Sequence, residues 1–166
     1  VPWMWVRLHT ERGLVGTGET YTRDHAQEGA LRDFANQLLG RDARRIERIW
    51  NDMYRRAAYN VTGGAEMRII SAVNIALHDL LGQALDVPVY QLLGGRVQDG
   101  IPVYQTARVR IKEEWTLEEN LEEIVQFLYD RGIEGIKIWP FDEIAWKHGR
   151  AHITPTQIDK KLDWIR

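Results

Sequence analysis

The strongest constraint on this chain is a change in the order of its predicted elements at about Asp86. Residues before this point read as two strands followed by three helices, whereas later residues read as strand, helix, strand and helix. Segregated strands and helices are typical of an α+β domain, and alternating ones are typical of a parallel α/β sheet or barrel. We therefore predict two domains, over residues 1–96 and 97–166.

Periodicity identifies the elements of the first domain. Residues 3–20 alternate in polarity around a short turn, which predicts an antiparallel hairpin. Apolar residues then recur at helical spacing in three runs, over residues 24–39, 46–57 and 65–85. Asp24 is the predicted N-cap of the first helix, with Gln27 three residues later. The third run is apolar on most sides, so we expect a helix buried between its neighbours.

The second domain reads as the start of a barrel. Two short apolar segments, 101–106 and 135–139, are predicted as buried strands. Thr116 and Glu119 form a capping box that predicts a helix over 117–128 between these strands. A closed (β/α)8 barrel needs about 200 residues or more. We therefore expect a barrel that is incomplete in this chain.

The last segment contains a polar loop and a further helix. Lys147, His148 and Arg150 form a short basic patch in this loop, which we expect to face solvent or to bind an anion at the barrel mouth. Thr154 and Pro155 predict the start of the last helix, because proline is favoured at the first helical position.

Composition excludes several classes of protein. The 166 residues carry 22 Lys and Arg against 24 Asp and Glu, for a net charge of −2, so we expect no nucleic-acid partner. Hydrophobic residues make up 44% of the chain, which is enough for a sizeable core. No apolar run approaches the roughly 18 residues that span a bilayer, so we expect no membrane partner and a cytoplasmic protein. The absence of cysteine excludes disulfides and thiolate chemistry.

Four segments resemble a known family. They are Val6–Thr10, Gly13–Thr20, Gly40–Asp42 and the long run Ala72–Gly95, in which Ala76-Leu77-His78-Asp79 leads into Pro88-Val89-Tyr90 and Leu92-Leu93-Gly94-Gly95. In this order they resemble the mandelate racemase/muconate lactonizing enzyme family of the enolase superfamily. The resemblance covers Val6 to Tyr104, and ordered matches over this length are far more specific than one short motif.

The resemblance implies both a fold and a chemistry. Members of the family combine an α+β capping domain, made of a hairpin or meander and a three-helix bundle, with a TIM-like barrel. Their barrel strands hold Mg²⁺ and a base that abstracts a proton next to a carboxylate. By this resemblance the substrate is a small carboxylate, such as an acid sugar, and the protein is a homo-oligomer. The Mg²⁺ ligands are expected beyond residue 166, so this segment alone is expected to be inactive.

Lys137 is the candidate catalytic residue. Many relatives carry Lys-x-Lys on the second barrel strand, and this chain has Lys137-Ile138-Trp139. Without the second lysine, a one-base reaction such as dehydration of an acid sugar is favoured over a racemase, an epimerase or a cycloisomerase, which stay as alternatives. Lys137 can also be only an exposed lysine at a strand end. A third alternative is a small α/β protein that binds or scaffolds without catalysis.

The other candidate residues belong to predicted loops and strand ends. By the resemblance, the capping loops reach over the barrel mouth, where they would bind substrate. The candidate substrate-binding residues are Tyr21, Thr22, Tyr59, Asn60, Thr106 and Trp139. Each of the loop residues can instead be a solvated turn residue, and Thr106 can be structural at the end of its strand.

Overall fold

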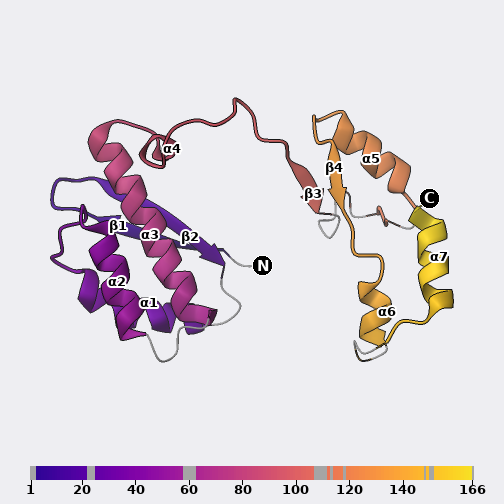
Figure 1. The fold of residues 1–166 in the computed structure, drawn as a ribbon, viewed down its shortest axis with the longest axis horizontal. Coiled ribbons are helices and arrows are strands. Elements are labelled where there is room, and N and C mark those ends of the chain that lie inside the picture. Colours follow the sequence, from indigo (N-terminus) through magenta and orange to yellow (C-terminus); the bar gives the residue numbers. More distant parts are fainter. Residues whose placement is uncertain are drawn as a thin grey trace. The chain divides into compact units, whose positions relative to one another are not determined.

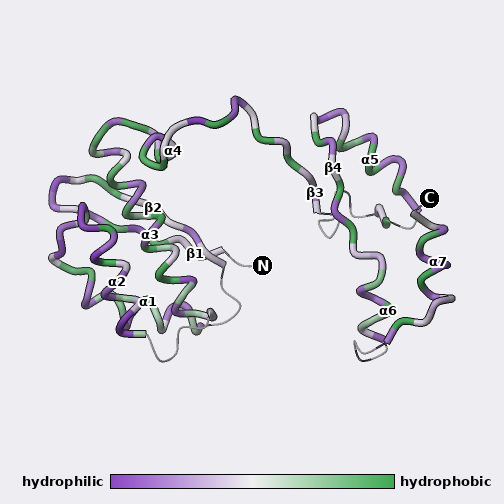
Figure 2. Tube along the Cα trace, in the orientation of Figure 1, coloured by the Kyte–Doolittle hydropathy of each residue, from purple (hydrophilic) through white to green (hydrophobic). Residues whose placement is uncertain are grey.

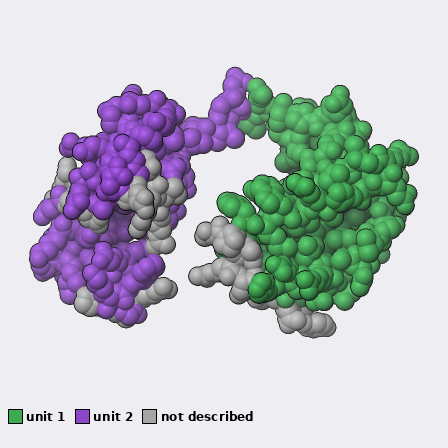
Figure 3. Space-filling view, turned by 180° about the vertical axis from the view of Figure 1, so that it is seen from behind, with its two compact units in different colours: residues 1–97 green, residues 98–166 purple. Residues whose placement is uncertain are grey.

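The computed structural model describes residues 3–21, 25–57, 63–106, 112, 114–117, 119–147, 149 and 152–165. The chain forms two compact units, residues 1–97 and 98–166 (Figure 3). The boundary lies one residue from the end of the predicted first domain. Each unit is described by itself below.

The first unit begins with the predicted hairpin. Strands β1 (Trp3–His9) and β2 (Val15–Tyr21) pair antiparallel, with Trp3 opposite Tyr21 and His9 opposite Val15. The side chain of Thr10 closes the turn, because its hydroxyl accepts a hydrogen bond from the Leu14 N–H at 3.0 Å. The alternation of polarity in the sequence therefore predicted this hairpin correctly.

Helices complete the first unit, and Figure 1 shows the longest of them lying along the hairpin. They are α1 (Ala26–Leu38), α2 (Ile46–Arg56), α3 (Gly64–Leu85) and the short α4 (Val89–Leu92). The three predicted helices are confirmed, and α4 was not predicted. The predicted N-cap Asp24 lies outside the described residues. Leu39 was assigned to the apolar face of α1, but it follows the last helical residue and is 77% exposed.

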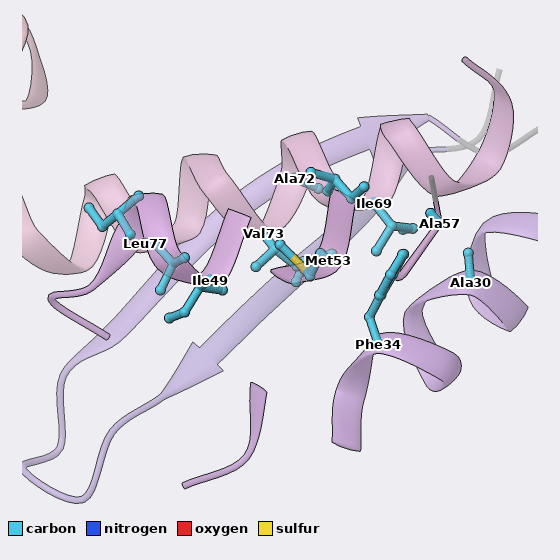
Figure 4. Close-up of a cluster of buried hydrophobic side chains, with 12 residues drawn as sticks. Ala30, Phe34, Ile49, Met53, Ala57, Ile69, Ala72, Val73 and Leu77 are labelled. Carbon is cyan, nitrogen blue, oxygen red and sulfur yellow. The ribbon is translucent and has the colours of Figure 1, made fainter. Parts of the chain in front are cut away.

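The core of this unit lies where the three long helices and the hairpin meet (Figure 4). Phe34 of α1, Met53 of α2 and Val73 of α3 are buried together in it. Helix α3 contributes more buried residues to this core than any other element, since both of its apolar faces are covered. Its buried residues are Ile69, Ile70, Ala72, Val73, Ala76, Leu77, Leu80 and Gly82. The nearly continuous apolar run in the sequence therefore reflects burial between two layers, as predicted.

Helix α3 approaches β2 so closely that two strand positions have no room for a side chain. A Cβ atom added to Gly18 would overlap the carbonyl oxygen of Ala72, and one added to Gly16 would overlap that of Ala76. The exposed edge of β2 is bonded to the same helix. Asp79 accepts a hydrogen bond from the Thr17 N–H at 2.8 Å. These contacts fix the position of α3 along the strand.

We expect Asp79→Ala to lower the free energy of unfolding by about 1.5 kcal/mol, because it leaves the partly buried Thr17 N–H without its charged acceptor. Asp33→Ala is the control, since Asp33 is exposed on α1 and is expected to change stability by less than about 0.5 kcal/mol. Urea unfolding followed by circular dichroism measures both. Equal effects of the two changes would contradict this role of Asp79.

The Gly40-Arg41-Asp42 motif anchors the start of α2. Arg41 forms an ion pair with Asp52 of α2 at 2.7 Å. Asp42 accepts two side-chain hydrogen bonds from Arg44, both at 2.9 Å, and these lower the pKa of Asp42 from 3.8 to about 2. The carboxylate also accepts from the Arg44 N–H at 3.1 Å, which closes the turn before the helix. This part of the family resemblance therefore has a structural role.

In its described residues, the second unit contains two strands and three helices. Strands β3 (Tyr104–Thr106) and β4 (Gly135–Lys137) pair in parallel, with α5 (Leu121–Tyr129) between them in sequence, as Figure 1 shows. Helices α6 (Asp142–Lys147) and α7 (Pro155–Ile165) follow. The predicted strand, helix, strand and helix are all present, and α6 is a further helix in the segment that was predicted as a loop. At the start of α7, the Thr154 hydroxyl accepts from the Gln157 N–H at 3.4 Å, as the predicted cap requires.

Several details of the second unit differ from the prediction. The first strand is shorter than 101–106, and its predicted burial is wrong, since Ile101 is 78% exposed. Only β4 pairs with β3 in the described part of the chain. Helix α5 starts at Leu121 instead of residue 117. Thr116 still accepts from the Glu119 N–H at 3.3 Å, so half of the capping box forms ahead of the helix.

Two further corrections concern side chains of the second unit. The helix predicted over 117–128 included Val125 among its apolar residues, but Val125 is 44% exposed, while Ile124 and Leu128 form the buried face of α5. Lys147 was placed in a loop, yet it ends helix α6 and pairs with Glu143 at 2.7 Å. The predicted partners of Lys147 in the basic patch, His148 and Arg150, lie outside the described residues.

The hydropathy of the residues varies along the helices, as expected for amphipathic elements. Figure 2 shows hydrophobic and hydrophilic segments alternating along the helices. Among the residues that the structure describes, no helix combines the length and the apolar character that a membrane span requires.

Candidate functional site

The two parallel strands bring Thr106 and Lys137 to the same strand end. These residues are register partners at the carboxyl ends of β3 and β4. Because paired residues of neighbouring strands lie on one face of a sheet, the two side chains lie on the same face. Two pairs back in the register, Gly135 faces Tyr104 so closely that a Cβ on Gly135 would lie 2.9 Å from the Tyr104 Cβ. A glycine at this position therefore lets the first residues of the two strands approach each other.

Trp139 extends this group beyond the end of β4. The Nζ atom of Lys137 lies 5.0 Å from the centroid of the Trp139 ring, within the range of a cation–π interaction. Lys137 is exposed, and Trp139 is 36% exposed, so both can contact a ligand. The structure thus brings together three of the predicted site residues, Thr106, Lys137 and Trp139.

Tyr21 belongs to the other unit, at the end of β2. Its phenol ring is 38% exposed and contacts the guanidinium group of Arg68, whose Cζ atom lies 3.9 Å from the ring centroid. Arg68 was missed by the sequence analysis. The signal for it was present, because Arg68 is a charged residue inside the apolar segment Met67–Val73.

The remaining predicted site residues cannot be placed. Thr22, Tyr59 and Asn60 lie outside the described residues. His78 is partly buried, and its Nδ1 atom lies 2.9 Å from the carbonyl oxygen of Asn74. It therefore has a hydrogen-bond partner within its own helix.

Acidic and histidine side chains do not gather into a metal site in the described part of the chain. Over these residues, no group of three or more His, Asp or Glu side chains is arranged to hold a metal ion. The exposed ammonium of Lys137 is instead the charged group at the strand ends. Such an arrangement suits an anionic ligand, with Thr106 as a hydroxyl donor and Trp139 as an apolar wall.

Comparison with known proteins identifies the family. Residues 2–94 match the family described as Mandelate racemase / muconate lactonizing enzyme, N-terminal domain. The chain belongs to this family. The match covers the first unit almost completely, and it confirms the resemblance inferred from the sequence motifs.

Relatives of the mandelate racemase/muconate lactonizing enzyme family extend the similarity into the second unit. D-galactonate dehydratase from Variovorax paradoxus (strain S110) is 37% identical over 149 residues, which cover 86% of this chain and 36% of the relative. D-galactonate dehydratase from Verminephrobacter eiseniae (strain EF01-2) is 44% identical over 105 residues, covering 61% of this chain and 27% of the relative. This chain therefore spans about a third of the length of these curated relatives.

A solved structure of the same superfamily resembles both units. The chain is similar to an enolase of the mandelate racemase subgroup from Agrobacterium tumefaciens, with 31% identity and a TM-score of 0.80. The similarity covers 99% of this chain and 41% of that protein. The fold class predicted from the sequence, a capping domain followed by the beginning of a barrel, agrees with this similarity.

Proposed function

We propose that this chain provides the capping domain and the first barrel strands of an acid-sugar dehydratase. On this proposal residues 1–96 are the capping domain and residues 97–166 open the barrel. The observation that carries the proposal is Lys137 at the end of β4, beside Thr106 and with Trp139 in place of a second lysine. The curated relatives named D-galactonate dehydratase support the same reaction class.

Dehydration of an acid sugar begins with loss of the proton next to its carboxylate. Negative charge then develops on the carboxylate oxygens, and groups that are preorganised to meet this charge lower the barrier. The exposed Lys137 ammonium can meet it from the strand end. Thr106 can donate a hydrogen bond to the same ligand, since it lies on the same face of the sheet. Trp139 cannot accept or return a proton, so this strand provides one titratable group instead of two.

Magnesium belongs to the proposal for the whole protein. A divalent cation would stabilise the charge on the substrate carboxylate. The described residues of this chain offer no acidic cluster to hold one, so the roles given to Lys137, Thr106 and Trp139 do not depend on it. We assign the Mg²⁺ ligands and the main base to barrel strands outside this chain. For this reason the 166-residue segment is expected to be inactive alone.

The setting of the enzyme is also part of the proposal. Its substrate is a small carboxylate, and the near balance of 22 basic and 24 acidic residues gives no reason to expect a nucleic-acid partner. We propose a cytoplasmic homo-oligomer, as the family resemblance implies.

Solvent deuterium distinguishes dehydration from isomerisation. The intact protein, meaning this chain together with the rest of its barrel, is incubated in D2O with Mg²⁺ and a panel of aldonic and aldaric acids. One-way dehydration predicts a 2-keto-3-deoxy acid as product and recovered substrate without deuterium at its α-carbon. Deuterated substrate without a keto acid would contradict the proposal and favour a racemase or an epimerase.

A further inference from the structure

We propose that Trp139 is a positioning residue for Lys137, whose ammonium group its ring holds at the end of β4 without neutralising it. This inference rests on the proposed function, because it takes Lys137 to meet the charge of an acid-sugar ligand. It goes further by giving Trp139 a role that is exerted through Lys137. The apolar wall that Trp139 offers a ligand is then secondary.

The local sequence places the indole ring on the side of the ammonium group. β4 ends at Lys137, and the next residues are Ile138, Trp139 and Pro140. A residue before proline is restricted to extended conformations, so Trp139 continues the direction of the strand. Side chains two residues apart on an extended chain lie on the same face. The structure agrees, since the Lys137 Nζ atom lies 5.0 Å from the centroid of the Trp139 ring.

Trp139 is itself held in place by the start of α6. Its carbonyl oxygen accepts a hydrogen bond from the N–H of Asp142, the first residue of that helix, at 3.4 Å. The Phe141 carbonyl accepts from the Ala145 N–H at 2.9 Å, which continues the turn into the helix. Trp139 is 36% exposed, so most of its surface is covered by the protein. The ring is therefore fixed before any ligand binds.

Lys137 has no other partner for its ammonium group in the part of the chain that the structure describes. There, no carboxylate forms an ion pair with Lys137, and the Trp139 ring is the group that contacts its Nζ atom. A free lysine side chain samples many rotamers, and fixing it when a ligand binds costs conformational entropy. Contact with the ring restricts these rotamers in advance, and so it reduces that cost.

An aromatic ring suits this task better than a carboxylate. Aspartate or glutamate beside the Lys137 Nζ atom would also hold the ammonium, but its negative charge would repel an anionic ligand. The indole ring of Trp139 attracts the cation through its quadrupole and carries no formal charge. The positive charge therefore stays available to a substrate carboxylate whose negative charge grows during the reaction.

NMR of the intact protein tests the contact without a ligand. With ¹³C-labelled lysine, the Cε–H resonance of Lys137 is identified by its absence in Lys137→Met. We expect the ring current of Trp139 to shift this resonance upfield from those of other exposed lysines. Trp139→Leu should remove the shift, and Trp139→Phe should keep part of it. Trp115→Leu is the matched control, because the Trp115 ring lies 3.9 Å from the Nζ atom of another lysine, Lys112, and its loss should leave the Lys137 resonance unchanged.

A double-mutant cycle tests whether the contact serves ligand binding. Calorimetry measures the affinity of the intact protein for the acid of the panel above that the wild type binds most tightly. Lys137→Met should weaken binding by about 10- to 100-fold, the usual range for a hydrogen bond to a charged group. Trp139→Leu should weaken it by about 3- to 30-fold, and Trp139→Phe by less than about threefold, since phenylalanine keeps a ring face. Added to Lys137→Met, Trp139→Leu should weaken binding by less than about twofold, because the ammonium on which the ring acts is already absent.

Three results would overturn the inference. The first is an equal effect of Trp139→Leu with and without Lys137, since the ring would then act directly on the ligand or on the fold. The second is a Lys137 resonance that does not move in Trp139→Leu, and the third is a wild type that binds none of the acids. Binding of an acid that depends on both residues, without any keto acid product, would instead overturn the proposed function alone.

Discussion

Gly18→Ala is expected to lower the free energy of unfolding of the first unit by about 3 kcal/mol or more. The new Cβ atom would overlap the Ala72 carbonyl oxygen, which belongs to a helix backbone and cannot rotate away. Either α3 must move from β2 or the strand must bend, and overpacking of this kind costs about 1–3 kcal/mol even where side chains can adjust. The displaced helix contributes the largest share of the buried core, so the loss spreads beyond one contact.

Gly29→Ala is the control for this change. Gly29 lies within α1, and a Cβ atom added to it would have no neighbour within 4 Å. Alanine should therefore raise stability there by about 0.5–1 kcal/mol, through its better helix propensity. Urea unfolding of both variants, followed by circular dichroism at a helical wavelength, gives the comparison. A Gly18→Ala chain within 0.5 kcal/mol of the wild type, a margin of about the size expected for a surface change, would contradict the close approach of α3 and β2.

Lys137→Met in the intact protein is expected to lower kcat by about 100- to 10,000-fold, the range over which a positioned acid, base or charge contributes to catalysis. Methionine keeps much of the length and the apolar stem of the side chain, so the loss should reflect the missing ammonium. The measurement is the rate of keto acid formation at saturating substrate.

Lys147→Met provides the control for Lys137. Lys147 is also an exposed lysine of the second unit, but it pairs with Glu143 on α6. Its replacement should change kcat by less than about threefold, since surface ion pairs contribute little. If both variants retain wild-type turnover, Lys137 is only an exposed lysine at a strand end.

Local sequence signals predicted the first unit well. Alternation in β1 and the nearly continuous apolar run of α3 are properties of short segments, and both elements formed where expected. Leu39 shows the limit of this reasoning, because a helical stripe does not reveal the last helical residue. The end of α3 at Leu85 was predicted correctly, although the residue that follows with a positive φ of 55° is Asp86 and not the glycine or asparagine usual at that position.

The second unit was harder to predict, because burial there depends on elements distant in sequence. Ile101 belongs to an apolar segment of the kind that forms buried strands, but it is exposed. In the described part of the chain, β3 pairs with β4 alone. Lys147 lies in a polar stretch that resembles a loop, yet pairs with Glu143 one turn earlier in α6. That pairing depends on the helical spacing of Glu143 and Lys147, which the sequence analysis did not recognise in this segment.

The residues of the candidate site also differ in how far the sequence alone could predict them. The positions of Lys137 and Thr106 near strand ends could be predicted, because short apolar segments locate the strands, and the register pairs the two residues. Arg68 could not be linked to Tyr21 from the sequence, since their contact depends on the packing of α3 along β2. Long-range contacts of this kind carry no local pattern.

The most direct measurement is product formation by the intact protein. With Mg²⁺ and a panel of aldonic and aldaric acids, we predict a 2-keto-3-deoxy acid as the product of at least one of them. Mass spectrometry of the reaction mixture would detect the loss of one water from the substrate. The absence of any such product across the whole panel, from a folded protein with its complete barrel, would contradict the assignment as an acid-sugar dehydratase.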